Sequence, residues 1–185
     1  MDCFIRNGYA HTRVDDIARE AGLSKGGIYF HFASKRDIFD ALQEIEVQRT
    51  MAAVMEAHQS EASAVTKIEN LAYRLVVEFG SNEAHRKFLI VLAEMGIRNP
   101  DIRERVVASH EAYLQAISAQ IRVGIEAGEI RDIDPDVAAL VLKLLMDGVE
   151  QAFALGYNID VQKLITQGLD VIVNGLSVRG AGGEG

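Results

Sequence analysis

The chain has 185 residues, 49% of them hydrophobic, so it can bury a core and is not expected to be disordered. Its single cysteine excludes an intramolecular disulfide and favours a reducing compartment. The sequence shows no signal peptide and no run of the roughly 18 apolar residues that a membrane span needs. We therefore expect a cytoplasmic protein that does not cross a membrane.

The net charge of −8 is unevenly distributed along the chain. Residues 1–36 hold six Lys and Arg against four Asp and Glu, a net of +2. Residues 37–185 hold thirteen basic and twenty-three acidic residues, a net of −10. This asymmetry favours a small nucleic-acid-facing module on an acidic body, although many enzymes show a similar asymmetry.

Two short helices are predicted at the start of the chain. The first covers residues 1–7 and is stopped by Gly8. The second begins at Thr12, where Asp15 three residues later resembles a capping box. Gly22 ends this second helix.

Longer helices are predicted in the rest of the chain. Ser24 is a good N-cap for a third helix over Lys25–Phe32, and Ser34 for a longer fourth one. Five further helices are predicted at about residues 62–79, 82–97 and 99–128, from 134 onward, and at 160–177. No segment alternates like a strand, so the fold class is all-α with about nine helices.

The stretch from Gly8 to Asp37 carries most of the information about function. Its two short helices are joined by Gly22, which permits a sharp turn. Ala18 is small where the helices would cross, and Leu23 and Ile28 can fill the corner. This is the sequence pattern of a helix-turn-helix.

The third helix has an unusual first turn, Lys25-Gly26-Gly27. Glycine costs about 1 kcal/mol relative to alanine in a helix interior, and less near an end. The cost is explained if the backbone must approach a DNA groove wall closely. Side chains that can donate to phosphate oxygens are Lys25, Tyr29, His31 and Lys35.

At these positions the chain resembles the N-terminal domain of the TetR (tetracycline-repressor) family of bacterial regulators. The matching residues are Gly8-Tyr9, Thr12, Ile17-Ala18, Ala21 to Gly26, Ile28-Tyr29, His31-Phe32 and Lys35. The first helix is short, because family members usually carry several more residues before the position of Met1. Either the start is misassigned, the chain is truncated, or this member packs its DNA-binding module with less support.

The resemblance implies a set of residues at or near DNA. They are Thr12, Arg13, Lys25, Gly26, Gly27, Tyr29, His31 and Lys35. Tyr29, His31 and Lys35 would hold the phosphate backbone. The position of Gly27 usually has a side chain that reads bases, so base contacts here must come from Lys25, Arg13 or elsewhere.

The resemblance also implies a domain organisation and partners. A helix-turn-helix DNA-binding domain would cover residues 1–45, an effector-binding and dimerisation domain residues 46–178, and a flexible tail residues 179–185. A homodimer would place two recognition helices in successive major grooves of a roughly palindromic double-stranded operator. A small-molecule effector would release this repressor by shifting domain orientation through the fourth helix.

Effector-pocket and dimer residues are expected in the C-terminal domain. The expected pocket residues are Phe88, Leu92, Met95, His110, Tyr113, Ile117 and Phe153. Each is individually more typical of ordinary core, and His110 of a core or rim histidine. The expected dimer-interface residues are Gly148, Ala152, Gly156, Leu164, Ile165, Leu169 and Ile172. Three of them, Gly148, Ala152 and Gly156, are spaced to lie on one face of the eighth helix.

Two other functions remain open at this stage. The first is a regulator that answers to a protein partner instead of a small molecule. The second is a helical-bundle enzyme with an incidental helix-turn-helix. The sequence shows no nucleophile–base pair, phosphate loop or metal-binding cluster, so we expect no enzyme activity, cofactor or metal.

Overall fold

The computed structural model describes residues 1–168 and residue 171, and this part of the chain is helical with no strand, as predicted. The elements are α1 (Asp2–His11), α2 (Val14–Glu20), α3 (Lys25–His31), α4 (Lys35–Gln59), α5 (Ala64–Ser81), α6 (Glu83–Arg98), α7 (Pro100–Glu126), α8 (Pro135–Ala154), α9 (Val161–Lys163) and a π-helical turn (Leu164–Gly168). The ninth predicted helix lies partly outside the described residues.

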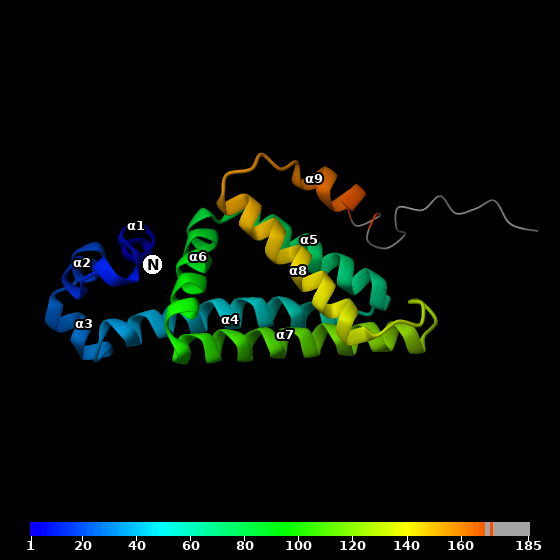
Figure 1. Ribbon diagram of the computed structural model, residues 1–185, viewed down its shortest axis with the longest axis horizontal. Coiled ribbons are helices and arrows are strands. Elements are labelled where there is room, and N and C mark those ends of the chain that lie inside the picture. The colour runs from blue at the N-terminus through cyan, green and yellow to red at the C-terminus, as the bar shows by residue number, and fades with distance from the viewer. Residues whose placement is uncertain (169–170, 172–185) are drawn as a thin grey trace, which may run out of the picture.

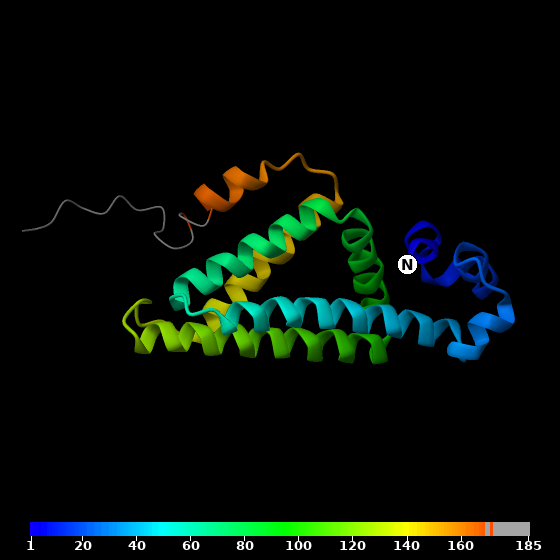
Figure 2. The same cartoon turned by 180° about the vertical axis from the view of Figure 1, so that it is seen from behind.

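The molecule is elongated, with α1–α3 at one end (Figure 1). Helices α4 and α7 lie side by side along its length, as the views from the front and from behind agree (Figures 1 and 2). Helix α6 stands across them, and α5 and α8 close a triangle above them. This triangle forms the body of the protein.

Ser24 and Ser34 cap α3 and α4, as predicted, and five later helices start at caps of the same kind. A side-chain oxygen accepts hydrogen bonds from first-turn N–H groups at Ser24, Ser34, Ser63, Asn82, Asn99, Asp134 and Asp160. Pro100 and Pro135 occupy the first turns of α7 and α8, where a missing N–H costs nothing. These local signals explain why the helix boundaries were predictable.

The junction between α1 and α2 differs from the prediction. Gly8 has a non-helical backbone (φ 69°, ψ 167°), so the first helical segment stops there, as predicted, and a second short segment continues α1 to His11. The predicted Thr12–Asp15 cap is wrong, because the hydroxyl of Thr12 is buried and donates to the carbonyl of Gly8 at 2.7 Å. Arg13 is the N-cap instead, and its N–H donates to the carboxylate of Asp16 at 3.2 Å.

Two hydrophobic cores share helix α4. The first joins α1–α3 to α4, α6 and the start of α7, and its buried residues are Phe4, Ala18, Ile28, Ile38, Phe39, Phe88, Val91, Leu92 and Ile102. The second joins α4, α5, α7 and α8. The proposed domain boundary at residue 45 falls inside α4 (Lys35–Gln59), and the first core extends across it. A movement of α4 in the body is therefore transmitted to α1–α3 through packing.

Candidate nucleic-acid interface and effector cavities

Helices α2 and α3 form a helix-turn-helix around a small core. Gly22 adopts a positive φ of 65°, which ends α2 and turns the chain. Ala18 and Ile28 are buried between the helices, as predicted. Leu23 is 51% exposed, so the prediction that it fills the corner is wrong.

The first turn of α3 presents bare backbone. Ser24 Oγ accepts from the N–H of Gly27 at 3.0 Å. A β-carbon added to Gly26 or Gly27 would meet nothing closer than Ser24 Oγ at 3.4 Å, an ordinary contact. Packing within the protein therefore does not require glycine at either position.

An exposed aromatic group on α3 was missed by the sequence reasoning. Phe30 is 84% exposed, with its ring edge-on to His31 at 5.0 Å. Tyr29 is 46% exposed beside it. The signal was available, because Phe30 is two positions from the buried Ile28, and two positions on a helix lie on nearly opposite faces.

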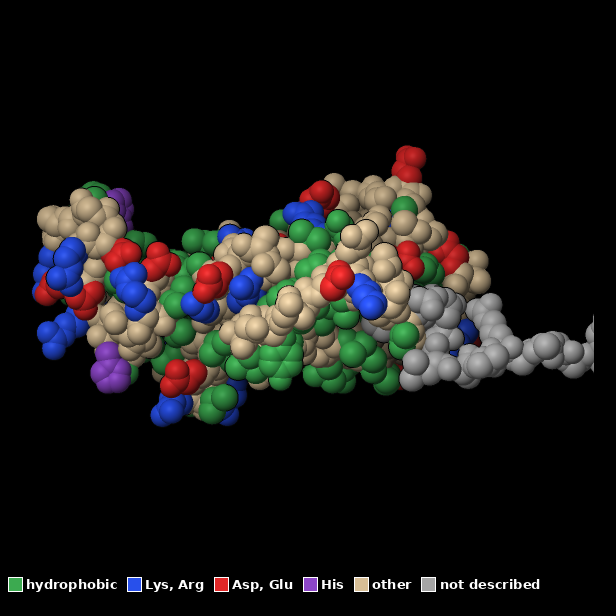
Figure 3. Space-filling model, turned by 90° about the horizontal axis from the view of Figure 1, so that it is seen from above, with side chains coloured by type: hydrophobic (Ala, Val, Ile, Leu, Met, Phe, Trp, Pro, Cys, Tyr) green, Lys and Arg blue, Asp and Glu red, His purple; other side chains and the backbone are tan. Residues whose placement is uncertain are grey.

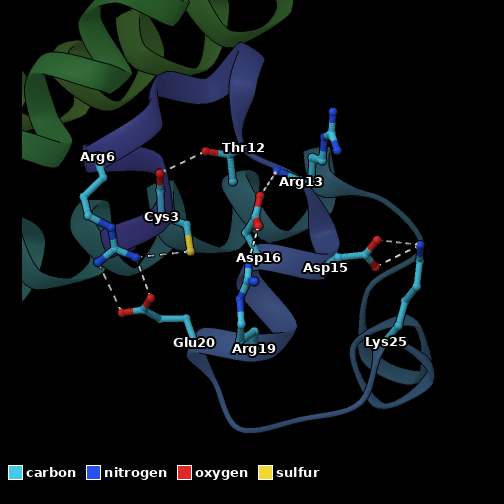
Figure 4. A network of polar contacts seen from close by, with 9 residues as sticks. All are labelled: Cys3, Arg6, Thr12, Arg13, Asp15, Asp16, Arg19, Glu20 and Lys25. Atoms are coloured by element: carbon cyan, nitrogen blue, oxygen red, sulfur yellow. Dashed lines mark hydrogen bonds and ion pairs between the residues drawn. The ribbon is translucent and has the colours of Figure 1, made fainter.

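Most basic side chains of this module have acidic partners. Figure 4 shows the ion pairs between Arg6 and Glu20 and between Lys25 and Asp15. Their nitrogen–oxygen distances are 2.5 Å and 2.8 Å. The hydrogen bond and charge of Asp15 raise the pKa of Lys25. The Arg13 side chain points away from these pairs and makes no ion pair within the described residues. Arg13 is thus the most available cation for a phosphate.

Lys35 is half-buried and is held by backbone carbonyls at the end of α1. Its ammonium donates to the carbonyls of Tyr9 at 2.7 Å, Thr12 at 2.8 Å and Ala10 at 3.3 Å, and lies 4.5 Å from the centre of the Tyr9 ring. Burial lowers the pKa of Lys35. The carbonyls at the C-terminal end of α1 engage the ammonium, and the Thr12 hydroxyl donates to the carbonyl of Gly8. A DNA contact of Lys35 or Thr12 stays a prediction and would require these side chains to exchange an internal partner for a phosphate.

Two cavities lie within the body. The apolar cavity, about 270 Å³, lies between α4, α5 and α7 and is lined mainly by residues such as Met51, Val54, Ile68, Leu71 and Ile117. The polar cavity, about 110 Å³, is lined by α4, α5, α6, α7 and α8. Met51 lines both of them.

The predicted pocket residues are distributed over several sites. Leu92, His110 and Tyr113 line the polar cavity, and Ile117 lines the apolar one. Two others belong to the first core, where Phe88 is fully buried and Met95 packs against it. Phe153 contacts α5 near Gly80 and lies under the Arg86 guanidinium. None of these three lines either cavity. Phe88 and Met95 on α6 pack into the first core, and Phe153 on α8 packs into the second core near Gly80 of α5.

The main polar groups of the polar cavity were also missed. Glu46 and His85 are buried, with His85 Nδ1 2.5 Å from Glu46 Oε2. Arg49 approaches the same carboxylate at 3.2 Å and Glu78 at 3.3 Å. A signal existed in α4, where Glu46 and Gln43 continue the helical stripe of buried apolar residues.

Further ionisable groups face this cavity from α7 and α8. Lys143 and Asp147 form an ion pair on α8. Burial, with the nearby charge of Asp147, raises the pKa of Glu150 to about 7. Burial raises the pKa of Tyr113 to about 12, and it lowers the pKa of His110, whose ring faces the cavity although part of the residue is exposed.

The outer face of α8 exposes a continuous apolar stripe. Its residues are 44–59% exposed and comprise Val137, Leu140, Val141, Leu144 and Leu145. Figure 3 shows hydrophobic side chains gathered along one side of the body. Gly148 and Ala152 continue the stripe at helical spacing, but Gly156 follows the end of α8 with a φ of 80°, so its predicted place on this face is wrong. Leu164 and Ile165 are half-buried, and Leu169 and Ile172 lie outside the described residues.

Comparisons with known proteins agree with this architecture. The family model of bacterial regulatory proteins of the tetR family matches residues 1–42, and that of the tetracyclin repressor-like C-terminal domain matches residues 88–167. A fatty acid metabolism regulator protein of Bacillus subtilis is 22% identical over 178 residues, covering 95% of this chain and 91% of that protein.

Two solved structures share the fold. A transcriptional regulator from Saccharomonospora viridis in complex with choline has a TM-score of 0.76 and 28% identity, covering 91% of this chain and 88% of that one. AibR in complex with isovaleryl coenzyme A and operator DNA has a TM-score of 0.74 and 18% identity, covering 92% and 91%. Within the described residues no helix is long and apolar enough to span a membrane. This chain is a DNA-binding transcriptional regulator of the TetR family, because its N-terminal and C-terminal parts both match models of that family.

Proposed function

We propose that this regulator is a homodimeric repressor that leaves its operator when a small molecule enters the cavities of the body. The observation that carries the proposal is the position of α4. Residues 38 and 39 of this helix belong to the core shared with α1–α3, and residues 43–59 line the cavities. A ligand that favours one position of α4 would therefore bias the position of the DNA-binding end.

The DNA interface in this proposal centres on α3 and the start of α2. Arg13 and Lys25 supply positive charge, and Tyr29 and His31 supply donors for phosphate oxygens. Gly26 and Gly27 let the backbone approach the groove closely. Phe30 adds an apolar surface suited to a thymine methyl group in the major groove.

The effector site in this proposal consists of the two cavities. Structural neighbours that bind choline or isovaleryl coenzyme A support the idea that this fold accommodates small molecules. A regulator that answers to a protein partner would not need an internal cavity lined by the helix that holds the DNA-binding end. The cavities therefore favour a small-molecule effector over a protein partner.

The dimer in this proposal uses the apolar stripe of α8. An uncovered stripe of five large apolar residues favours burial against a second helix. A β-carbon added at Gly148 would meet nothing within 4 Å, so a partner helix could approach closely there. The stripe and the symmetry of an operator both call for a second copy of this chain.

The remaining expectations fit the same proposal. A DNA-binding domain over residues 1–45 and an effector and dimerisation domain over 46–178 remain useful functional units, although they share α4. The DNA interface, the two cavities and the apolar stripe are sufficient for a cytoplasmic regulator that has no catalytic activity. All of its relatives named above are regulators.

The proposal is tested with DNA selected for binding from a random pool. The purified protein should enrich a roughly palindromic sequence and bind it as a dimer, as judged by fluorescence anisotropy and by sedimentation. A ligand found by thermal-shift screening should lower this affinity by tenfold or more. Ligands that stabilise the protein while leaving its operator affinity unchanged would contradict the repressor mechanism.

A further inference from the structure

The polar cavity contains two buried oxygen atoms that lack a hydrogen-bond partner. They are Gln43 Oε1 and Glu46 Oε1, on residues that are 4% and 3% exposed. Buried polar atoms in folded proteins are almost always paired, with protein, water or ligand. Two unpaired acceptors that line one cavity therefore point to a missing donor.

The two acceptors lie on one face of α4, and the Glu46 carboxylate is held in place by its neighbours. Gln43 and Glu46 are three residues apart on α4, so their side chains share a face. The other oxygen of Glu46 is held by His85 Nδ1 at 2.5 Å and by Arg49 at 3.2 Å. This contact leaves Oε1 as the unpaired oxygen of a buried carboxylate, and a carboxylate oxygen can only accept.

The lining of the cavity holds three carboxyl groups (Glu46, Asp147 and Glu150) against one lysine (Lys143), with His85 and His110 as further basic groups. Asp147 pairs with Lys143, and Glu46 pairs through Oε2 with His85 and Arg49. The unpaired carboxyl of Glu150 is therefore the group that favours a cation. Glu150 forms no ion pair among the described residues, and its carboxyl pKa is raised to about 7. A positive charge beside Glu150 would favour its ionised form.

We propose that the polar cavity binds the protonated amine of an organic cation, whose N–H groups donate to Gln43 Oε1 and Glu46 Oε1. This inference rests on the proposed function in taking the cavity as the effector site. A carboxylate or phosphate would place acceptors against acceptors, at a high cost in a buried site. Because Met51 lines both cavities and methionine is flexible, an apolar tail on the amine can extend into the apolar cavity.

Three probes with the same tail test the choice of head group: n-hexylamine, 1-hexanol and hexanoate. Isothermal titration should show n-hexylamine binding at least about tenfold more tightly than the other two, as expected for a charge-assisted hydrogen bond. The preference arises from the head group, because the tail contributes equally to all three. Hexanoate binding as tightly as n-hexylamine, or no measurable binding of n-hexylamine, would overturn the inference.

Variants locate the contact. Gln43→Met removes one acceptor at similar size, and Glu46→Gln removes the charge. Each should weaken n-hexylamine binding about tenfold and leave 1-hexanol binding unchanged. Ser109→Ala is the matched control, because Ser109 lines the same cavity but already donates to the carbonyl of Val106 at 2.8 Å. Equal losses for both probes, or an effect of Ser109→Ala as large as that of Gln43→Met, would place the amine elsewhere.

A linked proton gives a second readout that a purely structural role would not produce. At pH 7, n-hexylamine should release a fraction of a proton from Glu150, seen as a dependence of the titration heat on buffer ionisation. The released proton should disappear in Glu150→Gln. An amine that binds as predicted but leaves operator affinity unchanged would support this inference and refute the proposed function. The opposite result, operator release by hexanoate, would refute the inference alone.

Discussion

The DNA-binding end and the body of this protein differ in how fully their polar groups are paired and their apolar groups are covered. Around α1–α3 most polar groups have an internal partner: Thr12 and Lys35 bind α1 carbonyls, and Arg6 and Lys25 bind carboxylates. The body instead leaves two buried acceptors unpaired and an apolar stripe uncovered. The polar groups at the DNA-binding end are thus mostly paired within the chain, whereas the groups left unpaired or uncovered in the body are those on which the proposed ligand and the proposed second copy rest.

The largest expected effect comes from the uncovered stripe. Leu144→Glu, at a residue 59% exposed, should give monomers and lower operator affinity at least a hundredfold, because burying an unpaired carboxylate in the interface is costly. Sedimentation and anisotropy measure both effects. Glu104→Lys, on an exposed part of α7, is the control and should remain dimeric. An operator-competent dimer of Leu144→Glu would place the interface elsewhere.

Lys35 tests whether the DNA-binding end is internally complete. Lys35→Met should lower the free energy of unfolding by about 1–3 kcal/mol, because it leaves the α1 carbonyls without their donor. The salt dependence of DNA binding should keep its slope if the ammonium stays on the carbonyls of Tyr9 and Thr12 when DNA binds. Chemical denaturation measures the loss of stability, and fluorescence anisotropy at several salt concentrations measures the salt dependence of DNA binding.

Arg13→Ala provides the opposite pattern. It should leave stability unchanged and flatten the slope of log affinity against log salt by about 0.9. A flattened slope in Lys35→Met instead would show that the ammonium leaves α1 when DNA binds.

Phe30 sharpens the comparison, because it is the large apolar side chain that this end leaves most exposed. Phe30→Ala should leave stability within about 0.5 kcal/mol of the parent. It should weaken binding to the selected operator about tenfold, and more for sites with thymine at the contacted position than for those with cytosine. A uniform loss over all sequences would indicate a phosphate-side contact.

Glu150 gives the smallest effect, and its sign depends on pH. Its pKa is about 7 in the folded protein and 4.5 in the unfolded chain, so the folded state binds the proton more tightly. Its contribution to stability therefore falls as pH rises from 4.5 to 7. Glu150→Gln should be more stable than the parent by on the order of 1–2 kcal/mol at pH 8. Denaturation at pH 4 should show no difference. A parent that is the more stable at pH 8 would show that Glu150 is ionised and paired.

What the sequence by itself determined was local. Serine and aspartate caps, proline at first turns and glycine at turns act over three or four residues, and they predicted most helix boundaries, with the start of α2 as an exception. The spacing of residues 8–35 predicted the helix-turn-helix, and the helical period of α8 predicted an apolar stripe. Such signals need no knowledge of what lies opposite in space.

Tertiary structure alone decided how the polar residues are used. Lys35 meets Tyr9 from 26 residues away, and Glu46 meets His85 from 39 residues away. Phe88 fills a core, not a pocket, because of how α6 turns against α1 and α4. These outcomes depend on the crossing of helices distant in sequence, and a side chain's polarity does not reveal which distant group will satisfy it. The same reason explains why the open acceptors at Gln43 and Glu46 emerged only from the assembled helices.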